Sequence, residues 1–220
     1  HSRDNQTRGP AMKRDDFFGR WSQLHGGAEI KGVVRAWLTL SFGCCSFLKK
    51  LRITPNGLTY SSLLLAIVFL ALIETHWAIP LLVLSLAADG LDGTLAIITE
   101  KVSKWGAALD AIVDRVVESI WALGLFLLGA PWQAVLVAWL AAYSQEYMRA
   151  RAGGLGVQEV VVVTIAERPI RASVVFIVLV ARVFNFDVAG IVAIIWAAAQ
   201  VFAVVTVLVS LRPLLQQSQR

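Results

Sequence analysis

The sequence predicts an all-α, polytopic membrane protein with six transmembrane helices preceded by an amphipathic helix at the membrane interface. Of the 220 residues, 57% are hydrophobic and 16% are charged, and the mean hydropathy is +0.68. This composition is too apolar for a soluble domain of this size. The apolar residues also form long runs, such as Ser61–Ile73 and Val188–Leu211. A helix needs about 20 mostly apolar residues to cross a bilayer, so the runs are read as membrane spans.

The amino-terminal part of the chain differs from the rest. Residues 1–11 are polar and contain Pro and Gly, so we interpret them as a non-native leader ahead of a native start at Met12. Residues 12–52 mix Trp and Phe with Lys and Arg. Their apolar stretch, Val33–Leu48, is flanked by basic residues, which indicates an amphipathic helix lying on the cytoplasmic membrane surface.

Residues 53–212 are expected to form a six-helix transmembrane domain, followed by a cytoplasmic tail at 213–220. The motif Thr54-Pro55-Asn56 predicts the start of the first span, because Pro and short polar side chains are favoured in the first turn of a helix. By length and hydropathy, the spans are predicted at 56–74, 77–98, 103–129, 131–152, 168–184 and 187–211.

The distribution of Lys and Arg orients these spans. Basic residues precede the first span and occur in Glu100–Lys104, in Arg149–Arg171 and in the tail, whereas the turns Glu74–His76 and Gly129–Trp132 contain none. Because cytoplasmic loops carry the excess of Lys and Arg, both termini are predicted to lie in the cytoplasm. Arg182 is the exception, and we interpret it as a side chain that reaches the membrane surface.

The net charge is +5, but the basic residues lie mainly at the ends of apolar runs. Anionic lipid headgroups and phosphorylated substrates are therefore the expected partners, and nucleic acid is not. The two cysteines, Cys44 and Cys45, are neighbours and offer no disulfide framework, so we interpret them as packing residues.

Four aspartates form the most informative pattern. They lie within 26 residues, at the cytoplasmic end of the second span and the beginning of the third: Asp89, Asp92, Asp110 and Asp114. Spacings of three and four place each pair on one helix face, and two antiparallel helices would bring the faces together. Clustered carboxylates need cations, and hard oxygen ligands favour Mg²⁺ or Mn²⁺, with two ions suited to phosphoryl displacement. A proton or cation relay in a transporter, or aspartates paired with arginines, remains an alternative.

Seven residues within this stretch follow the pattern D-x2-D-G-x2-A, then G-x3-D-x3-D. They are Asp89, Asp92, Gly93, Ala96, Gly106, Asp110 and Asp114. This pattern resembles the signature of the CDP-alcohol phosphotransferase family. The likeness extends more loosely to Pro55-Asn56 and to the six spans that follow an interfacial helix.

The resemblance implies six transmembrane helices in the cytoplasmic membrane, a polar cavity facing the cytoplasm and a homodimer. By the same resemblance, the four aspartates would bind two divalent ions that hold the donor diphosphate. Asp114 would also accept the hydroxyl proton of the acceptor, and CMP would leave. Asn56, Gly93, Ala96 and Gly106 would lie beside the donor, which is expected to be CDP-diacylglycerol.

One position departs from the family pattern. Arginine usually follows the alanine, whereas this chain has Ile97. Lys101 or Lys104 could supply the missing positive charge. An inactive or repurposed member of the family therefore remains an alternative to an active enzyme.

Four arginines are predicted to bind the phosphate of the acceptor: Arg149, Arg151, Arg168 and Arg171. Guanidinium groups suit phosphate oxygens, although cytoplasmic topology alone can also explain arginines at these positions. Their segments resemble those of phosphatidylinositol-phosphate synthases, and phosphatidylglycerophosphate synthases also use a phosphorylated acceptor. Inositol phosphate and glycerol 3-phosphate thus both remain open. Glu118, one turn after Asp114, is a candidate either to support the site or to stabilise the helix packing.

Overall fold

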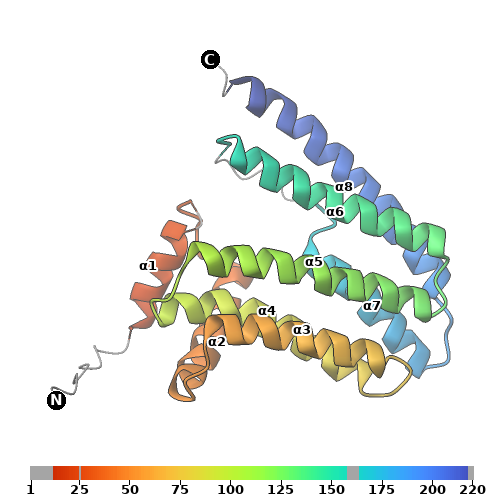
Figure 1. Cartoon of the computed structure of the whole chain (residues 1–220), viewed down its shortest axis with the longest axis horizontal. Coiled ribbons are helices and arrows are strands. Elements are labelled where there is room, and N and C mark those ends of the chain that lie inside the picture. Colours follow the sequence, from red (N-terminus) through yellow and green to blue (C-terminus); the bar gives the residue numbers. More distant parts are fainter. Residues whose placement is uncertain (1–11, 25, 158–163, 218–220) are drawn as a thin grey trace. The chain divides into compact units, whose positions relative to one another are not determined.

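The computed structural model describes residues 12–24, 26–157 and 164–217, and these form eight α-helices with no strand among them (Figure 1). The all-α prediction is confirmed. The predicted leader at 1–11 and the last residues of the predicted tail lie outside the described residues. The helices are α1 (Arg14–Leu24), α2 (Gly32–Lys50), α3 (Pro55–Ala71), α4 (Ala78–Ile98), α5 (Lys104–Leu127), α6 (Trp132–Gly154), α7 (Arg168–Val183) and α8 (Ala189–Gln217).

Two of the described helices, α4 and α8, are long and apolar enough to cross a membrane, and a third span is possible if α2 and α3 are counted together. The helices α3 to α8 begin and end close to the six predicted spans. The number of six spans is nevertheless not confirmed. Helices α3 and α7 have only 17 and 16 residues, and α5 carries Asp110, Asp114, Arg115 and Glu118 within its length. Charged side chains lower the hydropathy of a helix even when they face the interior of a helical bundle.

The start of α3 follows the predicted capping chemistry. The side-chain oxygen of Thr54 accepts a hydrogen bond of 3.1 Å from the backbone N–H of Gly57, and Pro55 is the first helical residue. Helices α2 and α3 are bent by 105° at the intervening segment. A helix that turns through such an angle before the first span fits the predicted surface helix, whose position at an interface stays a prediction.

The chain divides into two compact units. The first contains the described residues up to Tyr60 together with Ala87–Asp110, and the second contains Ser61–Leu86 and the described residues from Ala111 onwards. Apolar packing of α1 and α2 on the last turns of α4 stabilises the first unit. Phe17, Leu38 and Leu95 are buried in this cluster, and burial of large apolar side chains is the main favourable term in such packing.

In the second unit, α6 and α8 pack side by side (Figure 1). Two fully buried glutamines connect them. The side-chain amide of Gln200 donates a hydrogen bond of 2.7 Å to the carbonyl oxygen of Gln145. Gln145 in turn donates to the hydroxyl of Thr164 at 3.2 Å. Interhelical amide bonds of this kind hold helices together where water is absent.

The second unit also explains the exceptional position of Arg182. Its guanidinium lies 2.8 Å from the carboxylate of Glu74 and donates to the carbonyl of Leu128. A basic residue in a predicted outer turn is thus neutralised by an acidic partner from another predicted outer turn. This pairing satisfies the charge without requiring a change in the predicted topology.

Candidate active site: a carboxylate cavity and an arginine network

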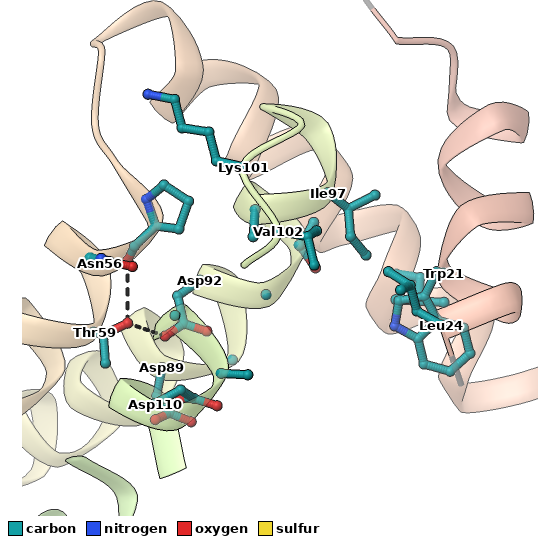
Figure 2. Close-up of a pocket in the computed structure, with 18 of the residues that line it drawn as sticks. Trp21, Leu24, Asn56, Thr59, Asp89, Asp92, Ile97, Lys101, Val102 and Asp110 are labelled. Atoms are coloured by element: carbon teal, nitrogen blue, oxygen red, sulfur yellow. Dashed lines mark hydrogen bonds between the residues drawn. The ribbon is translucent and has the colours of Figure 1, made fainter. Parts of the chain in front are cut away.

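The first unit contains a cavity of about 670 Å³ whose two sides differ in chemistry (Figure 2). One side is apolar and aromatic and comes from α1 and α2, including Trp21, Leu24 and Trp37. The other side is polar and comes from the start of α3, the second half of α4 and the start of α5. A volume of this size accommodates a nucleotide or a ligand of similar dimensions.

Three of the four predicted aspartates line this cavity: Asp89, Asp92 and Asp110. Asp89 and Asp92 are three residues apart on α4, so they share a helix face. Asp110 comes from α5, and one of its carboxylate oxygens lies within 4.8 Å of an oxygen of Asp89. Asp92 is only 7% exposed. The predicted approach of the two helix faces therefore holds for these three side chains.

Thr59 positions Asp92. Its hydroxyl lies 2.5 Å from Oδ2 of Asp92 and 3.3 Å from the carbonyl oxygen of Pro55. Because Thr59 is buried and lies on the first turns of α3, this contact ties the start of α3 to the acidic part of α4. Thr59 was not predicted from the sequence, since a single threonine in an apolar helix gives no signal of its own.

The residues predicted to contact the donor also line the cavity: Asn56, Gly93, Ala96 and Gly106. Gly106 lies close to its neighbours. A Cβ atom added there would lie 3.1 Å from the hydroxyl oxygen of Ser103 and 3.5 Å from the side-chain oxygen of Asn56. The Ser103 oxygen accepts a hydrogen bond of 3.0 Å from the N–H of Gly106, which caps α5 beside the start of α3.

Ile97, which stands where the family pattern has arginine, is 4% exposed. It packs in the same apolar cluster as Phe17 and Leu38 and contributes to the cavity wall. Lys101 lines the same cavity, whereas Lys104 does not appear in its wall. Of the two lysines considered as replacements for the arginine, Lys101 is therefore the one placed to supply a charge.

Oxygen ligands dominate the polar side of the cavity. The three aspartates supply carboxylate oxygens, and Thr59 and Asn56 add further oxygen atoms. Mg²⁺ and Mn²⁺ prefer such hard ligands, and they commonly retain waters while a few carboxylates and substrate phosphates complete the coordination. The residues in this wall fit a divalent cation site of that type.

Asp114, the fourth predicted aspartate, follows Asp110 by one turn of α5 and belongs to the second unit. Its Oδ1 lies 2.7 Å from Nη1 of Arg168, and each of these side chains is 17% exposed. Arg168 is the first residue of α7. An ion pair at this distance puts a positive charge directly beside the carboxylate, so Arg168 sets the electrostatic environment of Asp114.

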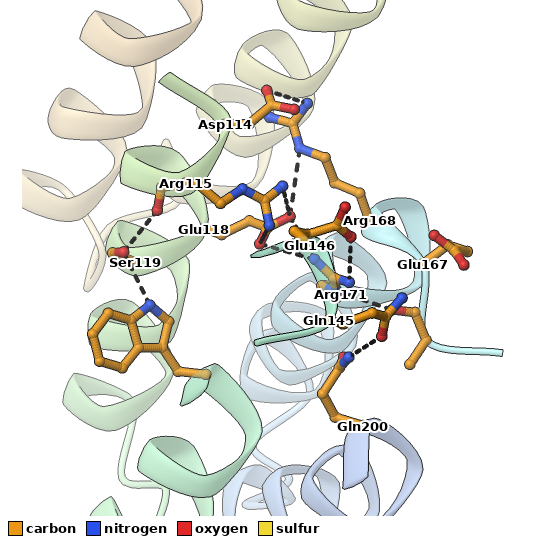
Figure 3. Close-up of polar contacts among 12 residues, drawn as sticks. Asp114, Arg115, Glu118, Ser119, Gln145, Glu146, Glu167, Arg168, Arg171 and Gln200 are labelled. Atoms are coloured by element: carbon orange, nitrogen blue, oxygen red, sulfur yellow. Dashed lines mark hydrogen bonds and ion pairs between the residues drawn. The ribbon is translucent and has the colours of Figure 1, made fainter. Parts of the chain in front are cut away.

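Arg171 lies deeper in the same network (Figure 3). It is 2% exposed, and its Nη1 lies 3.0 Å from both carboxylate oxygens of Glu118. Its remaining contacts are with Glu146 at 2.9 Å and with the carbonyl of Ala166 at 2.9 Å. Such a set of contacts is typical of a guanidinium that holds helices together.

Arg149 and Arg151 differ in their surroundings. Arg149 forms a two-pronged ion pair with Glu167, at 2.7 and 2.9 Å, whereas Arg151 is exposed. Burial raises the pKa of Glu167, but the hydrogen bonds from Arg149 and from the backbone and hydroxyl of Thr164 outweigh it and lower that pKa to about 2. The sequence prediction treats the four arginines alike, and the structure distinguishes them.

The network is electrically balanced. Four carboxylates and four guanidinium groups belong to it: Asp114, Glu118, Glu146 and Glu167 with Arg115, Arg149, Arg168 and Arg171. A phosphate that approaches these arginines must therefore compete with carboxylates that are already in place. The network roles of Glu146 and Glu167 were not predicted from the sequence, because the contacts of Glu146 with Arg171 and of Glu167 with Arg149 appear only when α6 lies beside the start of α7.

Comparison with known proteins supports a specific family. The profile of a family described as CDP-alcohol phosphatidyltransferase matches residues 52–212. The chain is 35% identical over 144 residues to an archaetidylinositol phosphate synthase of Pyrococcus horikoshii, covering 63% of this chain and 73% of the relative. It is 30% identical over 166 residues to an archaetidylinositol phosphate synthase of Aeropyrum pernix, covering 74% and 84% of the two chains.

Proposed function

The chain belongs to the CDP-alcohol phosphatidyltransferase family and is thus a transferase of the membrane, and we propose that it transfers a lipid phosphoryl group from a CDP-linked lipid to inositol phosphate, releasing CMP. The cavity lined by Asp89, Asp92 and Asp110 carries this proposal. It lies within the matched segment and combines carboxylates suited to divalent ions with room for a nucleotide.

Two divalent ions, Mg²⁺ or Mn²⁺, would be held by Asp89, Asp92, Asp110 and Asp114. Bound there, they would neutralise the donor diphosphate and stabilise the charge that develops on the leaving CMP. Thr59 keeps the Asp92 carboxylate in one orientation through its short hydrogen bond. Ligand orientation by such outer contacts commonly changes metal affinity by about 10–100-fold.

Asp114 is the proposed general base. It accepts the proton of the acceptor hydroxyl, whose oxygen forms a bond to the β-phosphorus as the bond to CMP breaks. The four arginines are the proposed acceptor-phosphate group, with a division of labour. Arg168 and Arg151 reach the phosphate, and Arg149 is shared with Glu167. Arg171 holds Arg168 and Arg149 in position through Glu118 and Glu146.

Asn56, Gly93, Ala96 and Gly106 are the proposed donor contacts, and Lys101 supplies the positive charge that Ile97 lacks. The lipid part of the donor is either diacylglycerol, as the family resemblance suggests, or an archaetidyl group, as the names of the two relatives suggest. The same names favour inositol phosphate over glycerol 3-phosphate as the acceptor.

We further propose that α3 to α8 cross the cytoplasmic membrane six times, that the site faces the cytoplasm and that the protein is a homodimer. The distribution of Lys and Arg supports the orientation, because cytoplasmic segments are enriched in these residues. Charged groups buried within α5 and α7 have partners, as expected for a bundle interior.

The decisive experiment measures CMP release by purified protein with Mg²⁺ or Mn²⁺. CDP-diacylglycerol and the archaetidyl donor are each offered with inositol phosphate, glycerol 3-phosphate, inositol, glycerol or serine. Release stimulated by inositol phosphate and abolished in Asp114→Asn supports the proposal. Stimulation by glycerol 3-phosphate alone would identify that compound as the acceptor in place of inositol phosphate. No release with any combination would point to an inactive or repurposed protein.

A further inference from the structure

Arg168 contacts three side chains of α5, of which Figure 3 shows Asp114 and Glu118. Its Nη1 is 2.7 Å from Asp114, its Nε is 3.8 Å from Glu118, and its guanidinium carbon is 5.6 Å from the centre of the Trp121 ring. Positions 114, 118 and 121 are separated by four and three residues, which places them on one stripe of a helix. A single guanidinium can contact all three side chains along this stripe.

The ion pair has a consequence for Asp114. A base accepts a proton only if the hydroxyl that gives up the proton, from the acceptor or from water, can approach the oxygen of the base to hydrogen-bond distance. The guanidinium lies 2.7 Å from Oδ1 as an ion pair, and at this distance it obstructs the approach of a hydroxyl to that oxygen. While the contact lasts, this oxygen is withdrawn from the reaction and its charge is partly neutralised.

A phosphorylated acceptor can open this contact, whereas water cannot. A phosphate group carries more negative charge than a carboxylate and offers several oxygens to a planar guanidinium fork. Each arginine of the balanced network is paired with a carboxylate, so the phosphate gains one of these arginines only by drawing it from its partner. Arg168 is the candidate, because its carboxylate partner is the proposed base and because it lies at the start of α7.

We propose that Arg168 is a gate on Asp114, closed in the absence of acceptor and opened when the acceptor's phosphate draws the guanidinium away. This inference rests on the proposed function. It adds that one arginine both recognises the phosphate and makes the base available. The gate discriminates between a phosphorylated alcohol and water, which is present in great excess.

The reaction that the gate suppresses is hydrolysis of the donor. In that reaction the oxygen of water forms a bond to the β-phosphorus, the bond to CMP breaks, and a proton of the water passes to Asp114. The products are CMP and the lipid phosphate, so the activated lipid is lost. Keeping Asp114 paired until the acceptor arrives limits this loss.

Glu118 and Trp121 keep the gate within reach. Glu118 is fixed by Arg171 and Arg115, and Trp121 is buried, so both present a constant surface to Arg168. The guanidinium can shift toward a phosphate while it stays over the aromatic ring, a contact worth about 0.5–2 kcal/mol. Glu118 and Trp121 are therefore positioning residues for the gate.

The test uses Arg168→Gln in the full chain, with Arg182→Gln as the matched control. Arg182 also lies on α7 and pairs with an acidic residue, but at the other end of the helix. CMP release is measured with and without inositol phosphate, and Mn²⁺ affinity is measured separately by electron paramagnetic resonance. Arg168→Lys keeps the charge without the fork and carries the test if the glutamine variant does not fold.

We expect acceptor-independent CMP release to rise about ten-fold or more in Arg168→Gln, a change of roughly 1.4 kcal/mol, and to stay constant in Arg182→Gln. Mn²⁺ should also bind more tightly, because Asp114 loses a competing cation. Loss of acceptor-dependent release without added hydrolysis would overturn the gate. If the wild type releases no CMP with any acceptor, the proposed function fails, and unchanged Mn²⁺ affinity in the variant would separately overturn the gate.

Discussion

Arg171 places one guanidinium nitrogen 3.0 Å from both carboxylate oxygens of Glu118, and the two side chains are 2% and 7% exposed. The contact joins α5 to α7, and the bond from Arg171 to Glu146 adds α6. Three helices thus meet at one buried guanidinium. Removing one partner of a buried ion pair leaves a charge without compensation, which is costly in a medium of low polarity.

Replacement of Arg171 should therefore reduce stability strongly. For Arg171→Leu we expect a loss of about 3–5 kcal/mol in the free energy of unfolding, measured by denaturant titration in detergent with tryptophan fluorescence. Arg182→Leu, whose ion pair is exposed, should lose less than about 1 kcal/mol. Equal losses in the two variants would contradict the structural role assigned to Arg171.

Thr59→Val should weaken metal binding while leaving the fold intact. The substitution keeps the shape of the side chain but removes the hydroxyl that contacts Asp92. We expect Mn²⁺ affinity to fall about ten-fold, as for other outer contacts of metal ligands. Thr206→Val is the control, because the Thr206 hydroxyl donates a hydrogen bond to the backbone carbonyl of Phe202 in its own helix. A normal affinity in Thr59→Val would remove Thr59 from the site.

Asp110→Asn should abolish metal-dependent CMP release. An amide in place of this carboxylate removes one charge from the cavity wall. Mn²⁺ affinity should therefore fall by more than about ten-fold, which is the smallest loss commonly caused by removing an outer contact of a metal ligand. Asp187→Asn, an exposed carboxylate outside the cavity wall, should behave as wild type. Chelation by EDTA should stop the wild-type reaction, and activity that survives chelation would exclude the metal mechanism.

Lys101 and Lys104 should differ in their effect on the donor. Lys101 lines the cavity and Lys104 does not appear in its wall. In Lys101→Gln we expect KM for the CDP-linked donor to rise about five-fold, the effect of roughly 1 kcal/mol at a partly exposed charge. Lys104→Gln should leave it within two-fold, where about 0.4 kcal/mol corresponds to a factor of two. A larger effect at Lys104 than at Lys101 would show that Lys101 is not the residue that compensates for Ile97.

The ion pair between Arg149 and Glu167 should weaken only at low pH. The pKa of Glu167 is lowered from 4.5 to about 2, so the folded state favours the ionised form. The resulting stability is fully present above pH 4.5 and is lost as pH falls toward 2. The difference in melting temperature between wild type and Glu167→Gln should thus be constant from pH 8 to 5 and shrink below 4.5. A difference that changes near pH 6 would point to another group.

Much of the fold follows from patterns that are local in the sequence. Long apolar runs predict the helices, and Thr54-Pro55 predicts the start of α3, because both signals depend on neighbouring residues. Helix α1 was not predicted, since its sequence is short and polar apart from Phe17, Phe18, Trp21 and Leu24. Its stability depends on apolar contacts with α2 and α4 that no local pattern reveals.

The candidate site also has parts that local sequence patterns predict and parts that they do not. Spacings of three and four residues predict that Asp89 and Asp92 share a face, and the helical period is sufficient for that step. The sequence could not separate Arg168 from Arg171, because the difference lies in their acidic partners on α5 and α6. Thr59 was missed for a related reason: its role appears only when α3 and α4 are packed together.

The glutamine pair between α6 and α8 has a consequence for how the chain is made. Gln145 and Gln200 are separated by 55 residues and each is fully buried, yet a lone side-chain amide in lipid lacks hydrogen-bond partners. In the proposed topology, α6 enters the bilayer before α8 is made, so the carbonyl oxygen of Gln145 lacks its Gln200 donor until α8 emerges from the ribosome. The carboxy-terminal helix therefore completes the fold, and a chain truncated before Gln200 should be recognised by cellular quality control as unfinished.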